Sequence, residues 1–170
     1  MIEVVVSRLG LDSTTQSYVI VLQEKGGNRL LPIWIGQPEA ESIVMQMHNI
    51  KRPRPLTHDL CKSLIIGLGG QVRKIHITRV ENNTYYAELH VARGGDMVQI
   101  DARPSDSIAI ALRLSAPIFA SEALLSDVQV EESTESFDAD ALKPQSELNA
   151  EQLKDYLEKL RPEDFGKFNL

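Results

Sequence analysis

The sequence predicts an α+β fold in which a mainly antiparallel sheet is packed against three core helices, followed by a C-terminal helical tail. Segments rich in β-branched residues come in two groups, and each group is joined internally by short turns. Apolar residues at helical spacing lie between the two groups and again after the second. Strands that cluster in this way, instead of alternating singly with helices, are typical of α+β proteins.

The first group contains three predicted strands, at residues 2–9, 17–24 and 29–35. The LDSTTQ and GGN segments between them are turn sequences, and the second favours a hairpin. Pro32 has no N–H to donate to a neighbouring strand, so the third strand should lie near a sheet edge or a bulge.

Two helices are predicted next. The first covers about residues 38–49 and must end at the KRPRP segment, because proline disrupts a helix. Thr57 is predicted to cap the second helix, which ends at Gly69 and Gly70. Cys61 lies in its apolar pattern and is interpreted as a small buried residue.

The second group of strands is predicted at residues 71–80, 84–92 and 96–102, with a bulge in the first of them because its alternation is incomplete. The third helix should begin near Pro104 and end before Pro117. The IFAS and EALL segments then predict a short strand and a helical turn.

Charge divides the chain into three predicted parts. Residues 1–126 hold 13 Lys+Arg and 12 Asp+Glu, a net charge of +1, and form the predicted domain. The remaining residues hold 5 and 12, a net charge of −7. Residues 127–147 are acidic and serine-rich, which predicts a flexible linker, and residues 148–170 predict a short helical tail that docks on the domain or on a protein partner.

Composition limits the class of protein. Hydrophobic content of 42% and charged content of 25% are typical of a soluble globular protein, and no apolar run is long enough to cross a membrane. The N-terminus reads as a strand, not as a secretion signal, and a single cysteine gives no internal disulfide, so we expect a cytoplasmic protein. A pI near 5.2 weighs against a strong non-specific nucleic-acid binder.

The IDARPSDSIAIALR segment combines charge with a helix that is apolar on nearly all sides. Asp101 and Arg103 should share one face of a strand, whereas Ser105 and Asp106 occupy the first helical turn, where negative charge or a bound phosphate is favoured. Arg113, seven residues later, lies on the same face of the predicted helix as Asp106. These residues predict either a functional site at the N-terminal end of a buried helix or a group of structural ion pairs.

The RPLTHDL segment places His58 and Asp59 in the first turn of the second helix. A histidine with a carboxylate can act as general base and orienting acid, or as two metal ligands. Neighbouring residues on a helix diverge by about 100°, so the two cannot easily share one ligand, and helix capping is the simpler interpretation.

Other titratable residues give weaker signals. Glu39 and Glu41 flank the apolar stripe of the first helix, and spacing alone cannot choose between them. His48, His76 and His90 show no ligand spacing and are interpreted as surface or strand residues.

Basic residues could follow a phosphate backbone, although a solvated loop and strand face is the simpler interpretation. Only 5% of residues are aromatic, so no platform for stacking bases is evident. The basic candidates are Lys51, Arg52, Arg54, Arg73, Lys74 and Arg79.

Four segments in order, LPIWIGQPEAESI, RPLTHDL, IDARPSDSIAIALR and PIFASEALL, resemble the bifunctional nuclease family over about residues 1–126. The resemblance implies a compact α+β domain that often forms oligomers and hydrolyses RNA and DNA. Ser107 departs from the family pattern, which usually has alanine there. The matching polar positions are Glu39, His58, Asp59, Asp101, Arg103, Ser105, Asp106 and Arg113.

The resemblance leads us to expect phosphodiester hydrolysis of single-stranded nucleic acid, assisted by Mg²⁺ or Mn²⁺. His58 would be the acid–base group, and Arg103 and Arg113 would hold phosphate. The carboxylates that would bind metal or activate water are Asp101, Asp106, Asp59 and Glu39, of which Asp101, Asp106 and Glu39 are the expected metal ligands. Ser105 and Arg54 complete the expected substrate-binding residues.

A different class of function also fits the sequence. The polar residues could form a buried network that fixes the fold or a homo-oligomer interface, in a regulatory or interaction module without enzymatic activity. A solvent-lined cleft around Asp101 and Asp106 would favour the enzyme, whereas a sealed network would favour the module.

Overall fold

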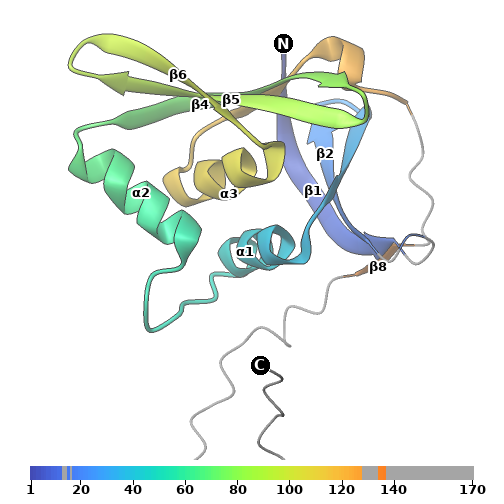
Figure 1. Ribbon diagram of the computed structural model, residues 1–170. Helices are drawn as coiled ribbons and strands as arrows, with labels where there is room; N and C mark the ends of the chain where they lie inside the picture. The colour runs from blue at the N-terminus through green and yellow to red at the C-terminus, as the bar shows by residue number, and fades with distance from the viewer. Residues whose placement is uncertain (13–14, 16, 128–133, 137–170) are drawn as a thin grey trace, which may run out of the picture.

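The computed structural model describes residues 1–12, 15, 17–127 and 134–136, the last three as backbone. It confirms an α+β fold in which one sheet carries three helices on one of its faces (Figure 1). The strands of this sheet are β1 (Ile2–Asp12), β2 (Ser17–Glu24), β3 (Leu30–Ile35), β4 (Gln71–Glu81), β5 (Thr84–Arg93), β6 (Asp96–Ala102), β7 (Ile118–Ala120) and β8 (Thr134–Ser136). The helices are α1 (Gln37–Met47), α2 (Thr57–Gly67), α3 (Pro104–Leu114) and the 3₁₀ turn η1 (Glu122–Leu124).

The strand order is β3-β2-β1-β7-β4-β5-β6, and β8 pairs with the end of β1. Each of the two predicted groups of strands forms an antiparallel meander. The three-residue strand β7 joins them, antiparallel to β1 and parallel to β4, so it lies at the middle of the sheet. The chain must therefore return from the edge strand β6 through α3 to this central position.

Several local predictions are confirmed. Pro32 lies on β3, which is an edge strand. Register shifts interrupt the pairing of β4 with β5 at two places, between Val72 and Lys74 and between Ile77 and Arg79, as the broken alternation indicated. Short β8 lies inside the predicted linker and was not expected, and the predicted C-terminal helix lies outside the described residues.

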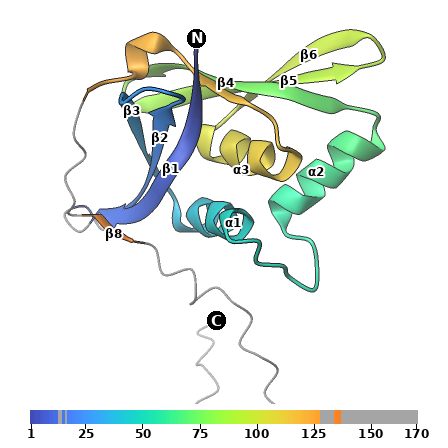
Figure 2. The ribbon, with the colours of Figure 1, turned by 180° about the vertical axis from the view of Figure 1, so that it is seen from behind.

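Helix α3 is the central helix of the molecule, because α1 and α2 both pack against it and the sheet covers its other side (Figures 1 and 2). Ile108, Ala109 and Ala111 are fully buried, which confirms the prediction of a buried helix. Pro104 begins the helix at the position where its missing N–H needs no partner. The start of α3 is therefore held at a fixed place between the other two helices.

One predicted helix cap is wrong. Leu56, and not Thr57, is the N-cap residue of α2, and its N–H donates to Asp59 Oδ2 at 2.9 Å. An aspartate in the first turn satisfies the free N–H and interacts favourably with the positive end of the helix. Among the described residues, no helix is both long enough and apolar enough to cross a membrane.

Candidate active site at the meeting of three helices

His58 lies at the centre of a polar cluster to which all three helices contribute. Its ring Nδ1 lies 2.8 Å from Ser42 Oγ on α1, and its Nε2 lies 3.0 Å from Asp106 Oδ1 on α3. An ionised carboxylate only accepts hydrogen bonds, so the bond to Asp106 requires a proton on Nε2. In the neutral ring Nδ1 is then the acceptor, and the Ser42 hydroxyl donates to it.

Arg103 connects this cluster to the start of α1. Its Nε donates to Asp106 Oδ2 at 2.7 Å, and its Nη2 donates to Glu39 Oε1 at 2.7 Å and to Asp106 Oδ1 at 3.1 Å. These two carboxylates raise the pKa of Arg103 further above its usual range, so the guanidinium stays charged. The Arg103 side chain is 66% exposed and its partner Glu39 only 15%, so the cation lies on the open side of the cluster.

Arg113 forms a second, more buried branch. Its guanidinium donates to Asp59 Oδ1 at 2.7 Å, to the Ala109 carbonyl at 3.0 Å and to the Ser42 carbonyl at 3.2 Å. Its side chain is only 4% exposed. Each of the three guanidinium nitrogens therefore has a protein acceptor, and these acceptors lie on three different helices. Arg113 thus links α1, α2 and α3.

Two aspartates in the cluster have pKa values below the ordinary one, which favours their ionised form. Burial raises the pKa of Asp106, but hydrogen bonds from Arg103 and His58 outweigh burial and bring the pKa below its ordinary value. The pKa of Asp59 is also lowered, because the bonds from Arg113 and the Leu56 N–H outweigh its desolvation. Asp106 is consequently a permanent anion beside His58 at neutral pH.

The cluster opens into a cleft of about 310 Å³ whose lining includes Glu39, Ser42, His58, Arg103 and Asp106. A second cleft of about 420 Å³ shares Met45 and Leu56 with the first. Its lining includes basic residues from the loop before α2 and from α2 itself. These cations are Lys51, Arg52, Arg54 and Lys62, with Arg113 at the base beside Asp59.

Asp101 is the main correction to the predicted site. It lies exposed on β6, directly opposite Glu88 of β5, and so points away from the helices. Asp101 and Arg103 therefore do not form the predicted pair, because Arg103 has already left the strand as the N-cap of α3. Ser105 is buried in the first turn of α3 and lines neither cleft.

Ser42 is the member of the cluster that sequence analysis did not identify. It lies one turn after Glu39 and is only 4% exposed. The available signal was a serine between the buried Ala40 and Ile43, on a stripe where only apolar residues were expected. Buried hydroxyls usually have a hydrogen-bond partner, so this position pointed to a polar neighbour from another element.

The carboxylates of the cluster do not form a complete set of metal ligands by themselves. Among the described residues, the oxygens of Glu39, Asp59 and Asp106 do not all lie close enough together to hold one ion. The Arg103 guanidinium lies between the carboxylates of Glu39 and Asp106. Two carboxylates can still suit Mg²⁺, which keeps several waters and often binds substrate phosphate. The donor set therefore fits Mg²⁺ or Mn²⁺ only if Arg103 moves aside and the nucleic acid supplies further ligands.

A model of the bifunctional nuclease domain matches residues 20–133, which include both clefts. The chain belongs to the bifunctional nuclease domain family. This assignment confirms the resemblance drawn from the four sequence segments.

Relatives of this bifunctional nuclease domain are found in bacteria and plants. An uncharacterized protein of Mycobacterium tuberculosis is 39% identical over 163 residues, which are 96% of this chain and 97% of the relative. Bifunctional nuclease 1 of Oryza sativa subsp. indica is 31% identical over 110 residues, or 63% of this chain and 33% of the plant protein. Bifunctional nuclease 2 of Arabidopsis thaliana is 32% identical over 105 residues, or 60% of this chain and 32% of its own length.

Proposed function

We propose that this chain is a nuclease that hydrolyses phosphodiester bonds of single-stranded RNA or DNA at the His58 cleft. The observation that carries the proposal is the hydrogen-bonded series Ser42–His58–Asp106, which lines an open cleft beside a basic one. The two plant relatives are named bifunctional nucleases, and their similarity to this chain supports the same class of reaction.

His58 is the proposed acid–base group. Asp106 orients the ring by accepting a hydrogen bond from Nε2, which leaves Nδ1 to accept a proton. The group next to Nδ1 is the Ser42 hydroxyl, at 2.8 Å. That hydroxyl is the proposed nucleophile: its proton passes to Nδ1 as Oγ attacks phosphorus, and His58 then gives the proton to the leaving oxygen. A water molecule hydrolyses the resulting phosphoserine and restores the Ser42 hydroxyl.

Phosphate is proposed to bind between the two clefts. Arg103 is exposed and can turn from the carboxylates of Glu39 and Asp106 toward a phosphate, and Arg54 lines the adjacent basic cleft. Guanidinium groups bind phosphate oxygens and stabilise the charge that develops during hydrolysis. Arg113 is assigned to the fold instead, because its guanidinium is buried and already has three protein acceptors.

Mg²⁺ or Mn²⁺ is a further part of the proposal, with Glu39 and Asp106 as its protein ligands. A divalent ion there would neutralise the phosphate and lower the pKa of a bound water. Asp101 is left out of this ligand set because it lies on β6, facing away from the helices.

The test is cleavage of labelled single-stranded RNA and DNA by the full chain, with Mg²⁺, with Mn²⁺ and with EDTA. We expect Asp106→Asn to lower the rate by about 100-fold or more, because it removes the charge that orients and supports His58. Asp101→Asn and Asp96→Asn make the same chemical change outside the cleft and should keep the rate of the wild type. Matching thermal unfolding and column elution must be shown first.

Other results would redirect the proposal. Loss of cleavage in Asp101→Asn alone would move the reaction to the opposite face of the sheet. Equal cleavage by all variants would indicate a contaminant, and no cleavage by folded wild type would favour the non-enzymatic module. Full activity in EDTA would remove the metal from the proposal while leaving the role of His58 in place.

A further inference from the structure

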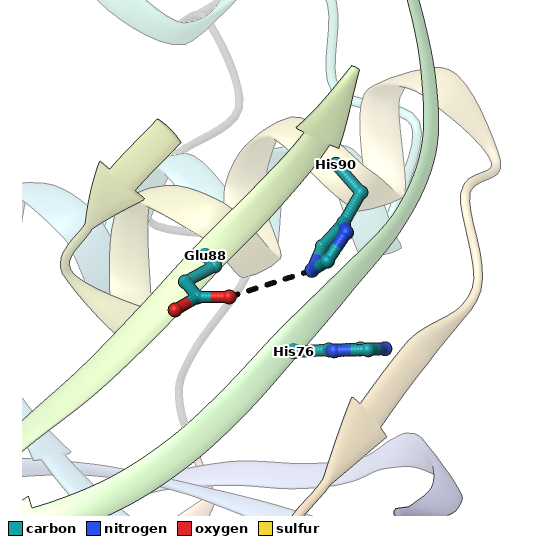
Figure 3. Close-up of side chains that lie close together, drawn as sticks. All are labelled: His76, Glu88 and His90. Carbon is teal, nitrogen blue, oxygen red and sulfur yellow. Dashed lines mark ion pairs between the residues drawn. The ribbon is translucent and has the colours of Figure 1, made fainter. Parts of the chain in front are cut away.

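A second cluster of titratable side chains lies on the face of the sheet that the helices do not cover. His76 of β4 lies opposite Glu88 of β5 in the strand register, and His90 follows two residues later on the same face (Figure 3). The alternate residues Ile75 and Leu89 are buried on the helix side. This cluster is therefore separated from the His58 cleft by the thickness of the sheet.

The three side chains form a compact set of possible metal ligands. Each offers one atom, and these atoms lie within 4.8 Å of one another. Two metal ligands at about 2.1 Å from a tetrahedral ion are about 3.4 Å apart. His90 Nε2 and Glu88 Oε2 are 3.5 Å apart, which is close to that separation and longer than an ordinary N–H···O hydrogen bond (Figure 3).

His90 supplies an independent reason to expect a ligand. Its side chain is only 8% exposed, and its Nε2 has no hydrogen-bond partner among the described residues. A buried polar atom without a partner destabilises the fold unless something else binds it. This atom is directed toward Glu88 Oε2, its ion-pair partner at 3.5 Å, so a single ion beside both atoms would satisfy it.

The surroundings fix the direction of one ring and place further charge on this face. Phe119 packs edge-on against His76 with ring centroids 5.6 Å apart and helps to fix its orientation. Asp101 lies opposite Glu88 and adds a second carboxylate to this face, whereas Lys74, opposite His90, adds one positive charge.

We propose that His76, Glu88 and His90 bind one divalent transition-metal ion on the outer face of the sheet. Two imidazoles and one carboxylate suit Zn²⁺, Co²⁺, Ni²⁺ or Fe²⁺ better than Mg²⁺, which prefers oxygen ligands. Three protein ligands leave a coordination position open for water. The site differs in place and in chemistry from the proposed nuclease cleft, and it does not depend on that function.

The test is metal binding by the full chain without a polyhistidine tag. After removal of metals by a chelator, the protein is titrated with ZnCl₂ by calorimetry and with CoCl₂ by visible absorption. We expect one equivalent of each ion, Co²⁺ d–d bands, and a higher thermal unfolding midpoint in Zn²⁺, because binding stabilises the folded state. His76→Gln, Glu88→Gln and His90→Gln should each weaken Zn²⁺ binding by about 100-fold or more.

Matched controls locate the bound ion. His48→Gln changes an exposed histidine at the end of α1 and should bind one Zn²⁺ like wild type. Asp106→Asn should also bind one Zn²⁺, since its carboxylate lies in the other site. The proposal is overturned if wild type binds no Zn²⁺, or if the three ligand variants, each folded by circular dichroism, bind it as tightly as wild type. It is equally overturned if Asp106→Asn alone loses the ion.

Discussion

At the scale of single residues, the polar cluster shows how one guanidinium can organise two helix starts. Arg103 follows β6, is the N-cap residue of α3 and contacts the carboxylates of Glu39 and Asp106 at 2.7 Å each. Such charge-assisted pairs fix side-chain direction as well as adding stability. The direction that Asp106 takes in turn sets which nitrogen of His58 carries the proton.

Ser107 gives a prediction for stability. It is fully buried in α3, and its Oγ has no hydrogen-bond partner among the described residues. Ser107→Ala should raise the free energy of unfolding by about 1–2 kcal/mol, because it removes an unsatisfied hydroxyl and improves helix propensity. Urea unfolding measures the change.

Ser63→Ala is the matched control for this prediction. Ser63 is an exposed serine of α2 whose hydroxyl bonds only locally, to the Asp59 carbonyl at 3.0 Å. Its replacement should change the free energy of unfolding by about 0.5 kcal/mol or less, since only helix propensity differs. A Ser107→Ala protein no more stable than wild type would show that the hydroxyl has a partner.

The lowered pKa values of Asp59 and Asp106 predict a loss of stability in acid. Their charged forms are favoured by folding, so their contribution is complete above the ordinary value near 3.8 and is lost as pH falls through the folded values. Urea unfolding at pH 7, 4 and 3 should show a smaller decrease below pH 4 in Asp106→Asn than in wild type. Asp96→Asn, on the exposed start of β6, should follow wild type, and an identical slope in Asp106→Asn would contradict the prediction.

At the scale of secondary-structure elements, α2 has two distinct faces. His58, Cys61 and Ile65 face the molecule, whereas Leu60, Leu64 and Leu68 form a row that is 53–64% exposed. Single exposed leucines are common, but a row at helical spacing is typical of a surface that another protein covers. The edge strand β6 exposes apolar residues as well, at Met97, Val98 and Ile100.

We expect a second copy of the chain to cover the α2 row, in line with the homo-oligomer expected from the family resemblance. Leu64→Glu would place a charge in the middle of the row and should convert the oligomer to a monomer in light scattering coupled to size-exclusion chromatography. Ser63→Glu introduces the same charge beside the row and should keep the mass of wild type. A monomeric wild type at about 50 μM would refute this expectation, on the basis that stable homodimers form well below that concentration.

At the scale of the whole molecule, the sheet separates two groups of candidate functional residues. The helix face holds the His58 cleft and the basic cleft, and the outer face holds His76, Glu88 and His90. Asp101 lies on β6 and faces the outer side, whereas Arg103 has left the strand as the N-cap residue of α3. The two residues therefore end in different surroundings although they are two positions apart.

The sequence by itself determined the order of the elements up to residue 126, the antiparallel pairing within each meander, the buried character of α3 and the family. These features follow from local patterns, because the spacing of apolar residues and the positions of proline and turn residues affect the backbone over only a few positions. It also identified Glu39, His58, Asp59, Arg103 and Asp106 as candidates.

Only the tertiary structure decided which of these candidates meet. Ser42 and His58 are 16 residues apart, and His58 and Asp106 are 48 apart, so no local pattern reports their contact. His76 and His90 have no ligand spacing along the chain, because their proximity comes from pairing between β4 and β5. Strand register and helix packing bring distant residues together, and the same packing leaves Asp101 on the outer face of the sheet.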